Sequence, residues 1–208
     1  MKISGKIIDV SRKEIYEGEI CITGERINEI RKKNDVDDVY IMPGLIDAHI
    51  HIESSMLTPG AFASAAVSRG TIGAVSDPHE IANILGIEGI DFMISDGKRT
   101  PFKFYFGAPS CVPASPFDEC FEPFTPEIIE DLMKRDDIHF LAEMMNFPGV
   151  IYKSESAMQI IGKAHSANKP VDGHVPGLSG DALKSYVSAG ITTDHVCFTL
   201  EEALEKIR

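Results

Sequence analysis

The 208-residue sequence lacks any apolar run close to the roughly 20 residues that a membrane-spanning helix needs. It also lacks the hydrophobic segment that follows the first basic residue of a secretory signal. Its four cysteines, Cys21, Cys111, Cys120 and Cys197, show no CxxC spacing. We therefore expect a soluble, cytoplasmic protein that has reduced thiols and no membrane contact.

Positive charge is scarce, because 20 Lys and Arg residues stand against 32 Asp and Glu residues and give a formal net charge of −12. No basic cluster exceeds the RKK run at 31–33. Nucleic-acid binding depends on basic patches that neutralise phosphates, so we expect no nucleic-acid partner. The 43% hydrophobic and 25% charged residues are typical of a folded globular protein.

Two regions of the sequence differ in how their apolar residues are spaced. Residues 1–40 alternate short β-like runs with turn signals, which predicts a β-rich segment with a small antiparallel sheet. From residue 41 to 208, apolar strands alternate with amphipathic helices. Strands are predicted at 40–50, 71–76, 102–108, 138–144, 169–174 and 190–195. Helices are predicted near 59–69, 87–97, 154–168 and 180–189, from Thr125-Pro126, and from Thr199, which forms a capping box with Glu202; Thr58 caps the first helix.

About six βα units imply a parallel sheet, either open or closed into a barrel. Ionisable residues follow almost every predicted strand, namely His49, His51, Asp77, His79, Glu143, His174 and His195. A barrel brings such residues to one rim, so the sequence favours an α/β fold with a partial (β/α)8 TIM-type barrel. Eight units complete a barrel, so we expect the front part of a larger protein, with open sheet edges that promote self-association.

A metal site is predicted from five of these residues. His49 and His51 are one residue apart on a predicted strand, so their side chains share a face. Glu143, His174 and His195 add imidazole and carboxylate groups, the usual ligands of Zn²⁺, Mn²⁺ or Fe²⁺. A single histidine at a strand end is more often structural, and Glu143 could instead form a salt bridge at the rim, but five candidates together make coincidence improbable.

Three other residues receive different interpretations. His139 begins its predicted strand and His165 lies in a helix with polar neighbours, so both are assigned to structure or surface. Cys111 lies beyond the third predicted barrel strand and could face the site. No base is evident beside Cys111, which argues against a nucleophilic role.

Six motifs make a resemblance specific: PGLIDAHIHIE (43–53), SDPHEIANILG (76–86), PSCVPASP (109–116), AEMMNFPGV (142–150), DGHVPGLSG (172–180) and GITTDH (190–195). The first resembles the first-strand signature of the amidohydrolase superfamily, whose members are metal-dependent hydrolases with a (β/α)8 barrel and a small β-sandwich. The other five together resemble one member family, adenine deaminase. The resemblance runs from about residue 40 to the end, and the β-rich segment 1–40 fits the first part of the sandwich.

The resemblance implies hydrolytic deamination of adenine to hypoxanthine and ammonia by a metal-bound hydroxide, as in purine salvage. It implies a pair of divalent metals, Mn²⁺ or Fe²⁺ with Zn²⁺ possible, and a homo-oligomer. By position, His49 and His51 would hold one metal and His174 and His195 the other. Glu143 would bridge the two metals and take part in catalysis.

Asp77, His79 and Glu80 match a further polar motif of the family. The match implies that these three residues face the pocket, either as an additional metal or substrate contact or as a hydrogen-bonded rim network. We assign catalytic roles to His79 and Glu80 and substrate contacts to Asp77 and Cys111. The family's proton-shuttling aspartate ends the eighth strand, beyond this chain, and Val196 stands where the family often has Glu. Two other functions stay open: an amidohydrolase acting on a cyclic amide or another amino-purine, or a non-catalytic metal-binding remnant.

Overall fold

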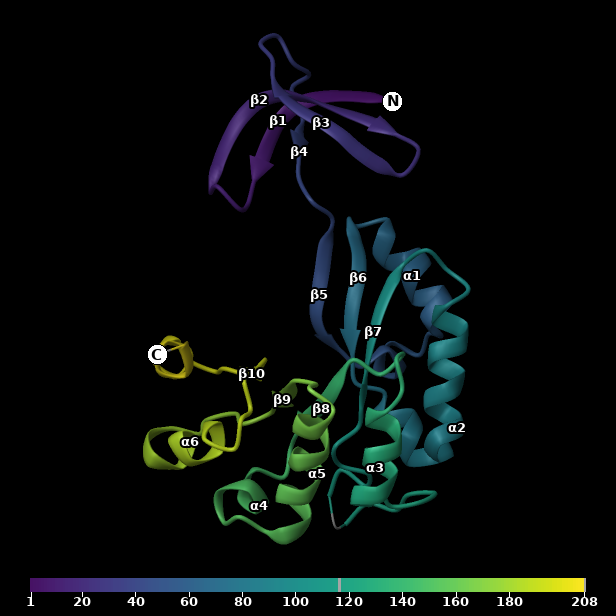
Figure 1. Ribbon diagram of the computed structural model, residues 1–208, viewed down its shortest axis with the longest axis vertical. Coiled ribbons are helices and arrows are strands. Elements are labelled where there is room, and N and C mark those ends of the chain that lie inside the picture. Colours follow the sequence, from purple (N-terminus) through teal and green to yellow (C-terminus); the bar gives the residue numbers. More distant parts are fainter. Residues whose placement is uncertain (116, 208) are drawn as a thin grey trace. The chain divides into compact units, whose positions relative to one another are not determined.

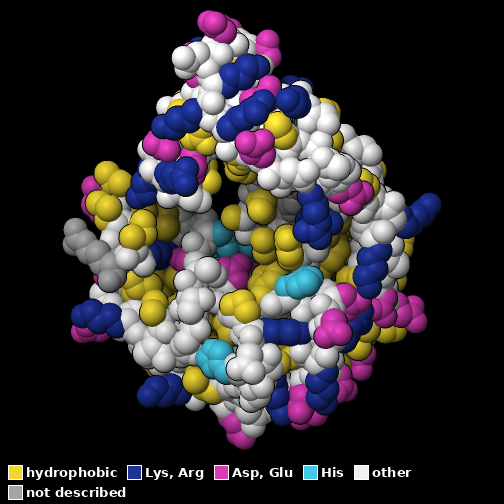
Figure 2. Space-filling view, turned by 45° about the horizontal axis from the view of Figure 1, so that its top comes forward, with side chains coloured by type: hydrophobic (Ala, Val, Ile, Leu, Met, Phe, Trp, Pro, Cys, Tyr) yellow, Lys and Arg dark blue, Asp and Glu magenta, His cyan; other side chains and the backbone are white. Residues whose placement is uncertain are grey.

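The computed structural model describes residues 1–115 and 117–207. The chain forms two compact units, Met1–Leu45 and Ile46–Arg208. Within the described residues, no helix combines the length and the apolar character that crossing a membrane would need. On the face shown in Figure 2, Lys and Arg side chains are scattered among Asp and Glu side chains.

The first unit is a four-stranded sheet in the order β3-β2-β1-β4. The strands β1 (Lys2–Asp9), β2 (Glu14–Thr23) and β3 (Arg26–Lys32) pair antiparallel, as predicted. The short β4 (Tyr40–Ile41) pairs parallel with β1. The sequence predicted one strand over 40–50, whereas the structure divides this stretch between β4 and β5 (Leu45–Ile50). Pro43 lies between the two and lacks the N–H that a continuous ladder requires.

The second unit contains one six-stranded sheet whose strands follow chain order from β5 to β10, and Figure 1 shows β5, β6 and β7 side by side. The strand pairs β6–β7, β7–β8, β8–β9 and β9–β10 are parallel. The remaining strands are β6 (Thr71–Ser76), β7 (Lys103–Ala108), β8 (Phe140–Met144), β9 (Val171–Gly173) and β10 (Thr193–Asp194). Side chains from all six strands line one hollow of about 490 Å³, so the sheet is curled into part of a barrel.

Helices connect successive strands, as the βα pattern predicts, and a last helix follows β10. They are η1 (Ile52–Ser55), α1 (Pro59–Val67), α2 (His79–Gly97), α3 (Pro126–Met133), α4 (Phe147–Ile151), α5 (Glu155–Ser166), α6 (Gly180–Val187) and α7 (Leu200–Ile207). In Figure 1, α1 and α2 run along one side of β6 and β7, and contacts join α1 to β6 and α2 to β7.

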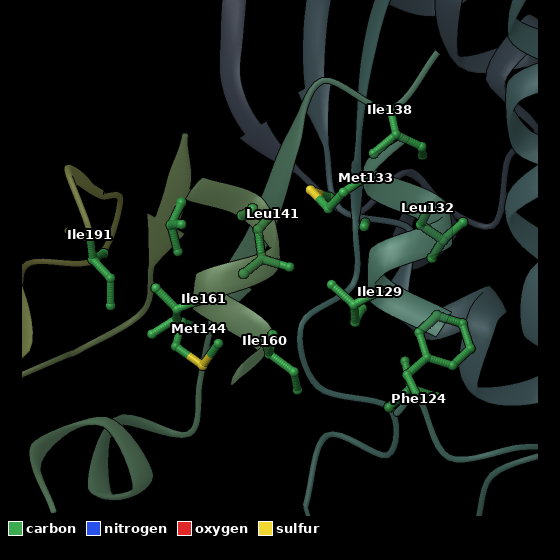
Figure 3. Close-up of a cluster of buried hydrophobic side chains, with 14 of the residues drawn as sticks. Phe124, Ile129, Leu132, Met133, Ile138, Leu141, Met144, Ile160, Ile161 and Ile191 are labelled. Atoms are coloured by element: carbon green, nitrogen blue, oxygen red, sulfur yellow. The ribbon is translucent and has the colours of Figure 1, made fainter. Parts of the chain in front are cut away.

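The main core lies between the sheet and its helices. Figure 3 shows Ile129 and Leu132 of α3 together with Ile161 of α5, close to Leu141 and Met144 of β8. All five side chains are buried. The helical face predicted for α5 is buried as well, through Ala157, Ile160, Ile161 and Ala164. Because β8 is buried along its whole length, Glu143 lies within the folded core rather than on its surface.

Several local features differ from the prediction. Helix α2 begins at His79 instead of near residue 87, and Gly86 interrupts it with φ 59° and ψ −140°. Thr58 precedes α1, but its side chain makes no capping hydrogen bond. Only half of the predicted capping box forms, since Thr199 Oγ1 accepts a hydrogen bond from Glu202 N at 3.2 Å, whereas Glu202 Oε2 accepts one from Phe198 N.

Candidate metal centre

The carboxyl ends of the parallel strands deliver a cluster of five imidazoles and three carboxylates. His49 lies in β5 and His51 directly follows this strand. Asp77 follows β6, and His79 is the first residue of α2. The others are Glu143 in β8, Asp172 in β9, His174 after β9 and His195 after β10. Neighbouring parallel strands end at one edge of the sheet, which is why residues so distant in sequence meet.

Glu143 occupies the centre of this cluster, and its side chain is almost completely buried. A ring nitrogen from each of the five histidines lies within 4 Å of its carboxylate. The distances to Oε2 are 2.8 Å from His174 Nδ1, 3.0 Å from His195 Nε2 and 3.7 Å from His49 Nε2; those to Oε1 are 3.3 Å from His51 Nε2 and 3.7 Å from His79 Nδ1. One carboxylate thus joins both sides of the cluster.

The short distances at Glu143 Oε2 do not have the geometry of hydrogen bonds. Among the described residues, Glu143 Oε2 has no hydrogen-bond partner, although ring nitrogens lie 2.8 Å and 3.0 Å away. Asp77 Oδ1 is likewise buried without a partner. Buried carboxylate oxygens without partners are costly, and a cation that they share with nitrogen donors removes that cost. The donor set therefore fits a divalent metal.

Asp172 links two of the histidines. Its Oδ2 lies 3.2 Å from His49 Nδ1 and 3.3 Å from His195 Nδ1. The rings of His49 and His195 are stacked, with centroids 3.4 Å apart and planes inclined by 11°. A carboxylate at Nδ1 fixes the ring and leaves Nε2 free as a ligand, and Nε2 of both rings faces Glu143. The sequence analysis missed Asp172.

Asp77 and His79 lie on the other side of the cluster. Asp77 Oδ2 is 3.2 Å from His79 Nδ1, and the Asp77 carbonyl oxygen is 3.0 Å from His51 Nδ1. When this carbonyl accepts a hydrogen bond from His51 Nδ1–H, the other ring nitrogen, Nε2, faces Glu143. His51, Asp77, His79 and Glu143 form one group able to hold an ion; His49, Asp172 and His195 form a second, and Glu143, His174 and His195 form a third.

Two of the predicted site residues have other contacts. Glu80 accepts a hydrogen bond from Ser54 Oγ at 2.5 Å and belongs to none of the three ligand groups among the described residues. Cys111 lies partly buried beside Ser110, whose hydroxyl is 3.3 Å from Sγ. Burial raises the pKa of the Cys111 thiol, which keeps it protonated and argues against nucleophilic attack by this residue.

The cluster shifts the pKa of its members. Burial lowers the pKa of His51 and of His195, but the carboxylates of Glu143, Asp77 and Asp172 outweigh it and raise both values to about 9. Burial also acts to raise the pKa of Glu143, yet the contacts with His195 and His51 hold it well below its usual range. Without a metal, protons on the imidazoles therefore balance the buried carboxylate charge.

The curled sheet partly surrounds a hollow that extends to this cluster. Apolar side chains, including Val75, Tyr105 and Phe140, line most of it, and Asp172 and His195 line it as well. His139, which the sequence assigned to structure or surface, is exposed and also borders the hollow, where its ring lies edge-on to Tyr105 at 5.3 Å. Asp172 and His195 thus connect the cluster to a largely apolar hollow.

Known proteins resemble this chain in sequence. It is 48% identical over 206 residues to the adenine deaminase of Methanosarcina mazei and 52% identical over 206 residues to that of Methanothermobacter thermautotrophicus. Each match covers 99% of this chain but only 37% and 38%, respectively, of the relative. The chain thus spans well under half the length of these curated relatives.

Solved structures agree in fold. The N-acetyl-D-glucosamine-6-phosphate deacetylase of Mycobacterium smegmatis matches 93% of this chain and 55% of its own chain, with a TM-score of 0.57 and 14% sequence identity. The enzyme of the same name from Pasteurella multocida gives a TM-score of 0.58 at 13% identity, with 93% of this chain and 56% of its own covered. The model of the amidohydrolase family matches residues 40–208, from β4 through all six strands of the curled sheet, and the chain therefore belongs to the amidohydrolase family.

Proposed function

We propose that this chain carries the metal centre of a hydrolase that converts adenine to hypoxanthine and ammonia. The observation that carries the proposal is the buried Glu143 carboxylate, which has five imidazoles within 4 Å and an oxygen that forms no hydrogen bond with the part of the chain that the structure describes. The likeness to proteins named adenine deaminase supports the choice of substrate.

The residues divide between two ions. His49 and His51 would hold one, His174 and His195 the other, and Glu143 would bridge them. Mixed imidazole and carboxylate ligands suit Mn²⁺, Fe²⁺ and Zn²⁺, and we favour Mn²⁺ or Fe²⁺. Such an ion, when bound, supplies a Lewis acid and lowers the pKa of a coordinated water. Asp172 would orient His49 and His195 through their Nδ1 atoms.

Deamination also requires a proton for the departing amine. His79 is suited to deliver it, since the charge and hydrogen bond of Asp77 outweigh burial and raise the pKa of His79 above its ordinary value. This shift favours the imidazolium, which is the form that can donate the proton. Glu80 could assist from its position beside Ser54, and Asp77 and Cys111 remain proposed substrate contacts.

The first test counts metal on the purified chain after anaerobic loading with Mn²⁺ or Fe²⁺, and measures hypoxanthine formation on the same sample. We expect two ions per chain, and a loss of metal in His49→Ala. His165→Ala is the matched control, because His165 is an exposed histidine of α5 that lies outside the cluster. Equal metal content in His49→Ala and the unmodified chain would contradict the ligand assignment.

The second test concerns the substrate. The metal-loaded chain is offered adenine, other amino-purines and cyclic amides, and the products are separated by chromatography. We expect adenine to be preferred. Preference for a cyclic amide or another purine would replace adenine as the proposed substrate, while bound metal without any turnover would restrict the proposal to the metal centre.

A further inference from the structure

Lys206 of α7 connects the two loops that carry His174 and His195. Its side chain is only 9% exposed. The ammonium donates hydrogen bonds to the carbonyl oxygens of Val175 at 2.9 Å and Val196 at 2.8 Å. These two valines directly follow His174 and His195 in the sequence. A third hydrogen bond goes to Glu202 Oε1 at 2.7 Å, which uses all three donors of the ammonium.

Asp194 completes the arrangement from the opposite side. Its Oδ2 forms an ion pair with Lys206 Nζ at 2.5 Å. Its Oδ1 accepts hydrogen bonds from the backbone N–H groups of Val196 at 3.2 Å and Val175 at 3.5 Å. The Lys206–Asp194 pair thus binds both the N–H and the C=O of each valine. The function proposed above assigns no role to Lys206 or Asp194, although the two residues hold the loops that follow His174 and His195 together.

We propose that Lys206 is a positioning residue that fixes the separation of the His174 and His195 imidazoles and so determines how tightly this side of the centre binds its ion. The inference rests on the metal centre proposed above. His174 Nδ1 and His195 Nε2 lie 3.3 Å apart, and both face Glu143 Oε2. Metal affinity depends on such groups behind the ligands, whose loss typically costs about 10- to 100-fold.

The burial of Lys206 explains why its removal would be felt at the ligands. Without the ammonium, Asp194 keeps a largely buried charge, and the carbonyls of Val175 and Val196 lose their donor. An uncompensated buried charge and unpaired carbonyls are costly, so the two loops must rearrange to reach water. Each loop begins at a proposed ligand, and the rearrangement therefore moves His174 relative to His195.

The test compares Lys206→Met with Lys163→Met in the 208-residue chain. Lys163 is a suitable control because it is also partly buried and ion-paired, to Glu130 at 2.6 Å, but lies away from the cluster. Co²⁺ serves as the probe, with its visible absorption and the number of bound ions both recorded. We expect the unmodified chain and Lys163→Met to bind two ions. Lys206→Met should bind one ion normally and the second at least about tenfold more weakly, with an altered Co²⁺ spectrum.

Lys206→Arg provides a second variant that keeps the charge and the donors. We expect it to restore most of the lost Co²⁺ affinity, which a purely structural role would not require. All binding is measured well below the melting temperature of each variant. Two ions bound with unchanged affinity by Lys206→Met would overturn the positioning role alone. A failure of the unmodified chain to bind Co²⁺ would overturn the proposed function instead.

Discussion

At the scale of single residues, the central question is how a charged carboxylate is stabilised inside the folded core. Glu143 is surrounded by imidazoles, and the raised pKa of His51 and His195, about 9 for each, shows how the metal-free chain balances its charge. Protons and metal ions thus compete for the same ring nitrogens. Binding of an ion must displace protons, since only the neutral ring is a ligand.

This competition predicts opposite pH dependences for metal affinity and for stability. The folded pKa of His51 and His195 exceeds the ordinary value of 6.5, so their pairing stabilises the metal-free fold fully below about pH 6.5 and ceases to do so as pH rises through about 9. Mn²⁺ affinity should rise over the same interval. Thermal melts in chelator and Mn²⁺ titrations, both between pH 6 and 9.5, measure the two effects.

Glu143→Gln isolates the cause of that pH dependence. The amide keeps the shape but removes the charge, so the pKa of His51 and His195 should fall and the loss of stability above pH 6.5 should shrink. Glu130→Gln is the control, because Glu130 is a partly exposed partner of Lys163, and this variant should leave the profile unchanged. A flat stability profile for the unmodified chain would contradict the raised histidine pKa values.

At the scale of secondary-structure elements, α2 depends on a glycine. Gly86 adopts φ 59° and ψ −140°, and the turn that it makes redirects the helix between His79 and the segment after residue 87. Any other residue is strained in this conformation. Gly86→Ala should therefore lower the free energy of unfolding by about 1 to 3 kcal/mol, measured by urea denaturation.

Gly162→Ala is the matched control within another helix. Gly162 lies inside α5, and a methyl group added there would meet no atom within 4 Å. Alanine is the better helix former, so this variant should gain about 0.5 to 1 kcal/mol. If both variants were stabilised, the conformation at Gly86 would not be a requirement of the fold.

The same elements show what the sequence could and could not predict. Glu143 was detectable as a candidate site residue because an ionisable group after the apolar Phe140-Leu141-Ala142 run is unusual. Asp172 was not, because an aspartate before a glycine is typical of turns and its three-residue strand is too short to show alternation. The first part of α2 was missed because Gly86 interrupts the helical period.

At the scale of the whole molecule, the six-stranded sheet has β5 and β10 as its outer strands. Outer strands present backbone groups that can pair with another chain. We expect the protein to form species larger than 22.8 kDa as its concentration rises in sedimentation velocity experiments. Ile46→Lys places a charge on β5 at a position that is 60% exposed and should reduce this association. A monomer at every concentration would contradict the prediction.

The strand order also has a consequence for synthesis. Because β5 to β10 pair in the order in which they leave the ribosome, the sheet can grow by adding each new strand to the edge of the last. His49 and His51 emerge first, and His195 emerges last, about 145 residues later. The group of His51, Asp77, His79 and Glu143 is therefore complete once β8 is made, whereas the two groups that contain His195 need the sixth strand, so the number of ions that a nascent chain captures reports how far its translation has proceeded.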